Sequence, residues 1–137
     1  MRAGALLLAA LAVLLAGCGH GGGGLQPVRG KVLRNNAPVA GASVVFHLED
    51  LGDPTATKPS AVTAADGSFT LSTYPAGEGA AAGNYVVLVT QYPPDARDHP
   101  NKARNMLPGK FASPETSPLR ATVEPGTNDL KPFELGT

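Results

Sequence analysis

The side chains that could hold a metal ion gather in one short segment, Asp95-Ala96-Arg97-Asp98-His99. Carboxylate oxygens and imidazole nitrogens are common ligands of divalent metals, so Asp95, Asp98 and His99 are the candidates for a metal site. The segment lies in a proline-rich stretch, and Arg97 competes for the same carboxylates. The pattern therefore favours solvated loop charge over a metal centre.

Sequence patterns of common catalytic sites are absent. The chain contains neither H-E-x-x-H nor G-x-S-x-G, and its single cysteine excludes a cysteine pair. The glycine-rich stretch Tyr74–Gly83 is followed by an apolar run and not by a Lys-Ser/Thr pair, so it does not match a phosphate-binding loop. We expect a protein without enzymatic activity and without a cofactor.

Cys18 follows the apolar run Ala5–Ala16, which itself follows Met1-Arg2. A run of roughly a dozen residues is too short to cross ~30 Å of hydrocarbon and is typical of a signal peptide. The run ends in Leu15-Ala16-Gly17-Cys18, which resembles the lipobox of bacterial lipoproteins, where the cysteine becomes the first mature residue and carries the lipid. The alternative is an ordinary signal peptide with an incidental cysteine. Because this only cysteine has no internal disulfide partner, lipidation is favoured.

These features predict three parts: a signal peptide over residues 1–17, the lipidated Cys18 with a tether over residues 18–25, and a folded domain over residues 26–137. The tether is rich in glycine, which loses much conformational entropy on ordering and therefore favours a flexible linker. Lipidation implies an exported protein that is anchored to a membrane through Cys18. Gly19 stands where an aspartate retains such lipoproteins in the inner membrane, so the resemblance implies the outer membrane in a cell with two membranes.

The composition favours a β-rich fold. The 137 residues include 17 Gly and 13 Pro, which interrupt long helices, and runs of β-branched residues recur between them. The part after the tether is long enough for one core. The 11 basic and 11 acidic residues of the whole chain are scattered, so we expect no binding of nucleic acid.

Alternation of apolar and polar residues predicts the strands of this domain. Asn35-Asn36 can adopt left-handed conformations and predicts a turn after the first strand. Pro132 cannot donate a ladder hydrogen bond, so the last strand should lie at a sheet edge. The predicted strands are Val28–Leu33, Ala42–Glu49, Asn84–Thr90, Leu119–Val123 and Leu130–Leu135.

Asp66-Gly67 predicts a β-hairpin with a two-residue type I′ turn, because both residue types tolerate positive φ. Ala65 and Ser68 would flank the turn. This register places four apolar residues on one face, Val62, Ala64, Phe69 and Leu71. It places three polar residues on the other face, Thr63, Thr70 and Ser72.

The strand Asn84–Thr90 is apolar on both faces, which a half-exposed strand should not be. Val86 and Leu88 lie on its second face. Either a loop covers them, or they form a contact face for a partner. The segment Gln91–Pro118 is the expected cover, with Leu107 and Phe111 packing it against the domain.

The segment Gln91–Pro118 also offers a binding function. Loops of this length often carry function, and Tyr92 could act as a stacking platform for a small ligand or a glycan. This alternative stands beside a purely structural role for the segment.

Four motifs in order, V-R-G-K-V, P-V-A-G-A-S-V-V-F, A-A-D-G-S-F-T-L and G-N-Y-V-V-L-V-T, resemble the carboxypeptidase regulatory-like (transthyretin-like) domain of small bacterial lipoproteins. The resemblance covers about Gln26–Leu135 and implies an all-β fold, a seven-stranded prealbumin-like Greek-key β-sandwich. Apolar Val86 and Leu88 depart from the polar residues usual there. The Tyr-Arg-Gly-Ser signature of the hydrolase branch of transthyretin-like folds is missing. The resemblance implies a non-catalytic envelope module with a structural or protein-interaction role, and an envelope protein as its partner.

Overall fold

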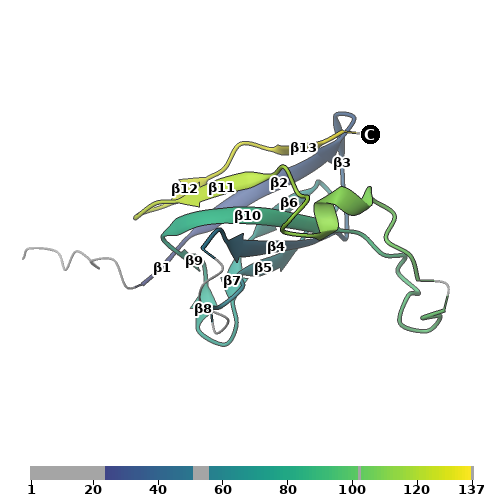
Figure 1. Ribbon diagram of the computed structural model, residues 1–137, viewed down its shortest axis with the longest axis horizontal. Coiled ribbons are helices and arrows are strands. Elements are labelled where there is room, and N and C mark those ends of the chain that lie inside the picture. The colour runs from purple at the N-terminus through teal and green to yellow at the C-terminus, as the bar shows by residue number, and fades with distance from the viewer. Residues whose placement is uncertain (1–23, 51–55, 102, 137) are drawn as a thin grey trace, which may run out of the picture.

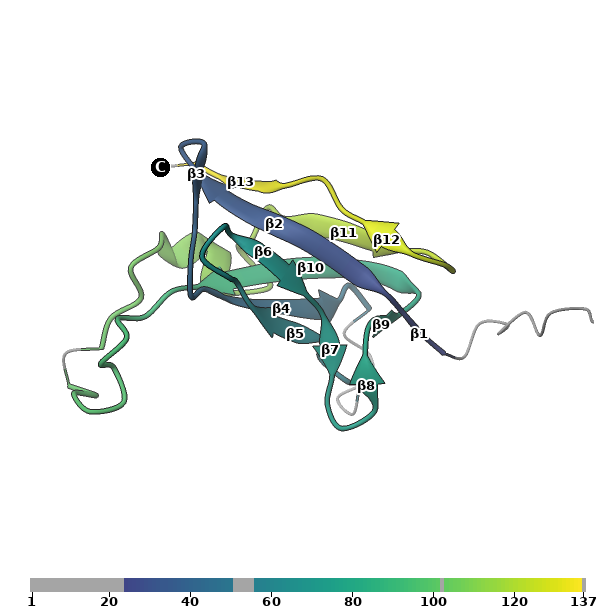
Figure 2. The same cartoon turned by 180° about the vertical axis from the view of Figure 1, so that it is seen from behind.

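The computed structural model describes residues 24–50, 56–101 and 103–136, and these residues form an all-β fold with almost no helix. Strands gather in two main sheets that share one apolar core, an arrangement consistent with a β-sandwich (Figures 1 and 2). The all-β prediction is therefore confirmed.

The larger sheet has six antiparallel strands in the order β11-β10-β4-β5-β7-β8. Its longest strand, β10, lies between β4 and β11, and the predicted alternation of Ala42, Val44 and Phe46 turns buried side chains toward the core. The strands are β4 (Ser43–Leu48), β5 (Ser60–Val62), β7 (Ser72–Thr73), β8 (Gly77–Glu78), β10 (Gly83–Thr90) and β11 (Arg120–Val123).

The second sheet is built around β2 (Val28–Arg34). Antiparallel β6 (Ser68–Thr70) lies on one side of β2, and parallel β12 (Asn128–Asp129) and β13 (Phe133–Leu135) lie in line on the other (Figures 1 and 2). Short β3 (Ala37–Pro38) folds back on the end of β2. The edge position predicted from Pro132 is confirmed, because β13 pairs with no described strand other than β2. The predicted turn is confirmed too, since Asn35 and Asn36 have φ of 52° and 63°.

Aromatic rings from both sheets meet in the core. The Phe46 ring of β4 lies 5.5 Å from the Tyr85 ring of β10, measured between centroids. Across the sandwich it lies 6.4 Å from the rings of both Phe69 and Phe133. Edge-to-face and tilted pairs at such distances are favourable beyond their buried area. One ring on β4 thus joins the two sheets.

The predicted hairpin at Asp66-Gly67 is wrong. Strands β5 and β6 belong to different sheets. A type I′ turn needs positive φ at both Asp66 and Gly67, but of these two residues only Gly67 has a positive φ, 82°. The Ala64 amide donates to Ser68 O and the Gly67 amide to Ala64 O, so three residues make the turn. Consequently Val62, expected in the core, is 70 % exposed.

Thr63, expected on the polar face, is buried where the chain changes sheet. Its hydroxyl donates to Val39 O at 2.6 Å and accepts from the Ala42 amide at 2.8 Å. These two bonds join the turn to the chain before β4. A buried polar side chain with both partners supplied is stable here, which period-two alternation does not predict.

The stretch Tyr74–Gly83, expected to be a loop, contains β8 and β9 (Ala80–Ala81). The short strand β9 pairs with β1 (Leu25–Gln26), which joins the tether side of the domain to the sandwich. Gln26 also accepts from the Gly126 amide at 2.7 Å through its side-chain oxygen.

Candidate functional site

The predicted lipidation site lies outside the described residues. Leu15, Ala16, Gly17 and Cys18 all precede residue 24, the first residue that the structure describes. Within residues 24–50, 56–101 and 103–136, no helix has the length and hydropathy to span a membrane.

Val86 and Leu88 lie on the outer face of β10, where they are only 6 % and 9 % exposed. The segment that follows Pro108 approaches this strand through a short 3-10 helix, η1 (Gly109–Ala112). We call residues 106–118 the strap. Pro114 of the strap and Val86 line the same hollow. The two side chains therefore offer little accessible surface to a partner.

Leu107 and Phe111 join the strap to the domain, as the sequence predicts. Both are buried in the same apolar cluster as the core residues Val44, Val87 and Val89. Burial of two large apolar side chains contributes roughly 3–6 kcal/mol to holding the strap in place.

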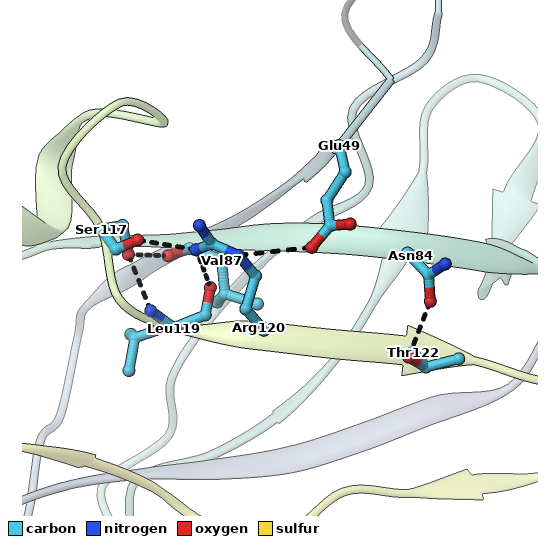
Figure 3. Close-up of polar contacts among 7 residues, drawn as sticks. All are labelled: Glu49, Asn84, Val87, Ser117, Leu119, Arg120 and Thr122. Carbon is cyan, nitrogen blue, oxygen red and sulfur yellow. Dashed lines mark hydrogen bonds and ion pairs between the residues drawn. The ribbon is translucent and has the colours of Figure 1, made fainter.

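The strap ends in a polar connection to the sheet (Figure 3). The Ser117 hydroxyl donates to Val87 O at 2.6 Å and accepts from the Leu119 amide at 3.3 Å. Next to it, Arg120 donates to Ser117 O at 2.7 Å and forms an ion pair with Glu49 at 3.3 Å. These contacts align the strap with the start of β11. Sequence reasoning missed them, because no pattern links Ser117 to a strand thirty residues earlier.

A second set of interacting charged side chains involves the strap, and its members are His47, Lys58 and Glu115. Burial and the nearby Lys58 lower the pKa of His47, while the carboxylate of Glu115 opposes this shift. The Ser113 hydroxyl donates to Glu115 and lowers the pKa of its carboxyl group. Sequence reasoning placed His47 on a polar face, but the strap residue Glu115 that faces it was not foreseen.

Tyr92 lies at the other functional candidate, a shallow hollow of about 420 Å³. Its side chain is 49 % exposed, and Pro93, Pro94 and Arg97 line the same hollow. A half-exposed aromatic ring beside a guanidinium group could stack against a sugar ring and pair with an acidic substituent. The predicted stacking platform is thus accessible.

The loop that carries Tyr92 has a fixed base. Asn105 accepts from the Gln91 amide at 3.0 Å and from the Leu107 amide at 3.1 Å through its side-chain oxygen. The Met106 amide donates to Gln91 O at 2.7 Å. The segment 91–118, expected as one loop, therefore divides into a projecting loop up to Asn105 and the strap that packs on the sheet.

The metal-ligand candidates Asp95, Asp98 and His99 lie on a tight turn of this loop. The amides of Asp98 and His99 both donate to Asp95 O at 3.0 Å, and all three residues are exposed. Among the described residues, no three His, Cys, Asp or Glu side chains are grouped so that they could hold a metal ion.

The two ends of the domain differ. The tether side leaves from β1, beside β8 and β9, whereas the projecting loop after β10 lies at the opposite end (Figures 1 and 2). An anchor on the tether would therefore leave the Tyr92 hollow at the far end of the domain.

Comparison of the chain with models of protein families, with curated proteins and with solved structures finds no match. The resemblance to the carboxypeptidase regulatory-like domain accordingly stays a prediction.

Proposed function

We propose that this protein is a lipid-anchored envelope protein whose non-catalytic β-sandwich acts as a structural or protein-interaction module. The observation that carries the proposal is Leu15-Ala16-Gly17-Cys18 at the end of a short apolar run, with one cysteine in the whole chain. A thiol at this position is the group that the lipid modification requires. Multiple acyl chains, each contributing about 0.8 kcal/mol per buried methylene, provide durable anchoring.

The proposal includes a prealbumin-like Greek-key fold with seven principal strands. Its support is the path of the chain, which passes from β2 to the six-stranded sheet, returns at β6, and leaves again at β7. Seven strands result when β6 with β7, and β12 with β13, are each counted as one interrupted strand alongside β2, β4, β5, β10 and β11. An experimental structure with a different strand order would contradict this part.

The anchor is tested by Cys18→Ser in the producing cell. We expect the native chain to fractionate with membranes and to incorporate labelled palmitate, whereas the variant does neither. A variant that still fractionates with membranes through the domain alone would contradict anchoring by lipid. Where the cell has two membranes, Gly19→Asp should shift the protein from the outer to the inner membrane.

The alternative function is binding of a small ligand or a glycan at the projecting loop. The accessible ring of Tyr92, beside Arg97 in the hollow, favours this candidate. Saturable binding of an oligosaccharide from a panel should be lost in Tyr92→Ala. The matched control is Tyr74→Ala, which removes a ring that is 92 % exposed and lies outside the hollow. Equal loss in both variants would contradict a site at Tyr92.

A further inference from the structure

We propose that the free edge of β11 binds an extended segment of a partner protein, which adds a strand to the six-stranded sheet. This inference rests on the proposed function as an interaction module and names the surface and the chemistry of its partner. Strand β11 is the terminal strand of the sheet, so among the described strands only β10 pairs with it.

The register identifies the backbone groups that point away from the sheet. The Val87 amide donates to Leu119 O, so Leu119, Ala121 and Val123 direct their backbone groups toward β10. Arg120 and Thr122 alternate with these residues and direct their N–H and C=O outward. Within the described part of the chain, no hydrogen bond uses these outward backbone groups.

The next outward amide, that of Glu124, is already satisfied. It donates to the side-chain oxygen of Asn128 at 2.9 Å, and this contact limits the free edge to the part before Glu124. An amide that is capped by a side chain cannot pair with an added strand. The available edge is therefore short and consists of the outward backbone groups of Arg120 and Thr122.

A hollow of about 330 Å³ runs along this edge. Arg120, Ala121 and Thr122 line one side, and Leu130, Lys131, Pro132 and Phe133 line the other. Three apolar residues here, Leu119, Ala121 and Leu130, pack against the core while remaining partly exposed. An added strand would bring alternate side chains over them, which buries apolar surface as well as pairing backbone groups.

Three other sheet edges are less suited to strand addition. Strand β8 has two residues and is flanked by Gly77 and Gly79, whose φ values of 131° and 100° interrupt an extended edge. Pro38 in β3 and Pro132 before β13 lack the amide that a ladder needs. Strand β11 contains neither glycine nor proline.

Charge indicates the kind of partner. Lys131 is exposed in the hollow and forms no ion pair with an acidic side chain among the described residues, while Arg120 is paired with Glu49. A second copy of this chain would bring its own Lys131 and Arg120 to the same interface, which like charge disfavours. The partner segment is therefore extended, apolar at alternate positions, and carries an acidic side chain near Lys131.

The test uses the full chain in intact cells, with a photoreactive residue in place of exposed Pro132 and a control probe in place of Tyr74. We expect an adduct from position 132 alone, mapped by mass spectrometry to a segment of another protein with the alternation and acidic residue described. Thr122→Pro removes the outward amide and should reduce the adduct yield roughly tenfold, while Thr122→Val retains that amide and should leave the yield within about twofold. Both variants lose the same hydrogen bond from the Thr122 hydroxyl to Asn84.

Lys131→Glu provides a second variant at an exposed position, and its adduct yield should also fall. Equal yields in Thr122→Pro and Thr122→Val, an adduct with a second copy of this chain, or no adduct from position 132 would overturn the inference. Acylation of Cys18 is measured in the same cells. If the protein is acylated and bound to membranes but gives no adduct, only the proposal of strand addition at β11 is refuted. If Cys18 is unmodified, the proposed lipid anchor is refuted, with or without the adduct.

Discussion

Replacing Ser117 by alanine should weaken the attachment of the strap to β10. The buried hydroxyl of Ser117 bridges Val87 O, at 2.6 Å, and the Leu119 amide, at 3.3 Å, and so fills the first rung between β10 and the start of β11. Its removal leaves a buried acceptor without its donor, which costs about 1–3 kcal/mol. For a domain of this size, roughly 4 °C of Tm corresponds to 1 kcal/mol, so we expect Tm to fall by about 4–12 °C.

Thermal unfolding of the purified protein, followed by circular dichroism, measures this fall. Hydrogen exchange at the Leu119 amide should become faster in the same variant, because its acceptor is gone. The matched control is Ser113→Ala, which removes an exposed hydroxyl that donates to Glu115 and should change stability by less than about 0.5 kcal/mol. A fall in Tm below about 1 °C with unchanged exchange at Leu119 would refute the reasoning, since the ladder would then close without the hydroxyl.

Three further substitutions follow from the packing, the backbone and the charges. Phe46→Ala should destabilise the domain by about 3–5 kcal/mol in chemical denaturation, because it empties the centre of the aromatic contacts between the sheets; a loss below about 1 kcal/mol would contradict that role. Gly67→Ala should destabilise more than Gly41→Ala, since both have positive φ but only the new Cβ at Gly67 would lie 2.6 Å from Val32 O; equal losses would contradict the clash. Because the pKa of His47 is lowered in the folded protein, the unfolded chain binds more protons, and the free energy of unfolding should fall as pH falls through the ordinary value of 6.5. His47→Gln should reduce this dependence on pH, measured by chemical unfolding between about pH 7.5 and 5.5. An unchanged dependence in the variant would contradict the lowered pKa.

Local patterns predicted the main strands because each records burial on one face. Val28 and Val32 of β2, and Val44 and Phe46 of β4, are buried as period-two alternation requires. Val86 and Leu88 on the second face of β10 are buried, which is one of the two outcomes that its continuous apolar run allows. These signals lie within a few residues of one another and need no knowledge of tertiary contacts.

The turn after Thr63 could not be predicted in the same way. Alternation and Asp66-Gly67 both favour a hairpin, but the hydroxyl of Thr63 bonds to the chain before β4, and the strand after the turn enters the other sheet. The choice between these arrangements depends on contacts with residues more than twenty positions away. A local pattern carries no such information.

The candidate sites also divide into those that local sequence predicts and those that depend on tertiary contacts. Exposure of Tyr92 follows from its place on a proline-rich loop, and the sequence predicted it as a platform. The contacts of Ser117 with Val87 and of Arg120 with Ser117, and the free edge of β11, depend on strand order and were not foreseen. Lipidation at Cys18 is a prediction from sequence alone.

The most direct test of the proposed anchor is mass spectrometry of the N-terminal peptide of the protein isolated from its own cells. We predict that the mature chain begins at Cys18 and carries a glycerol-linked lipid on the thiol, with residues 1–17 removed. An N-terminal peptide that retains residues 1–17, or a mature chain with an unmodified Cys18, would contradict the proposal.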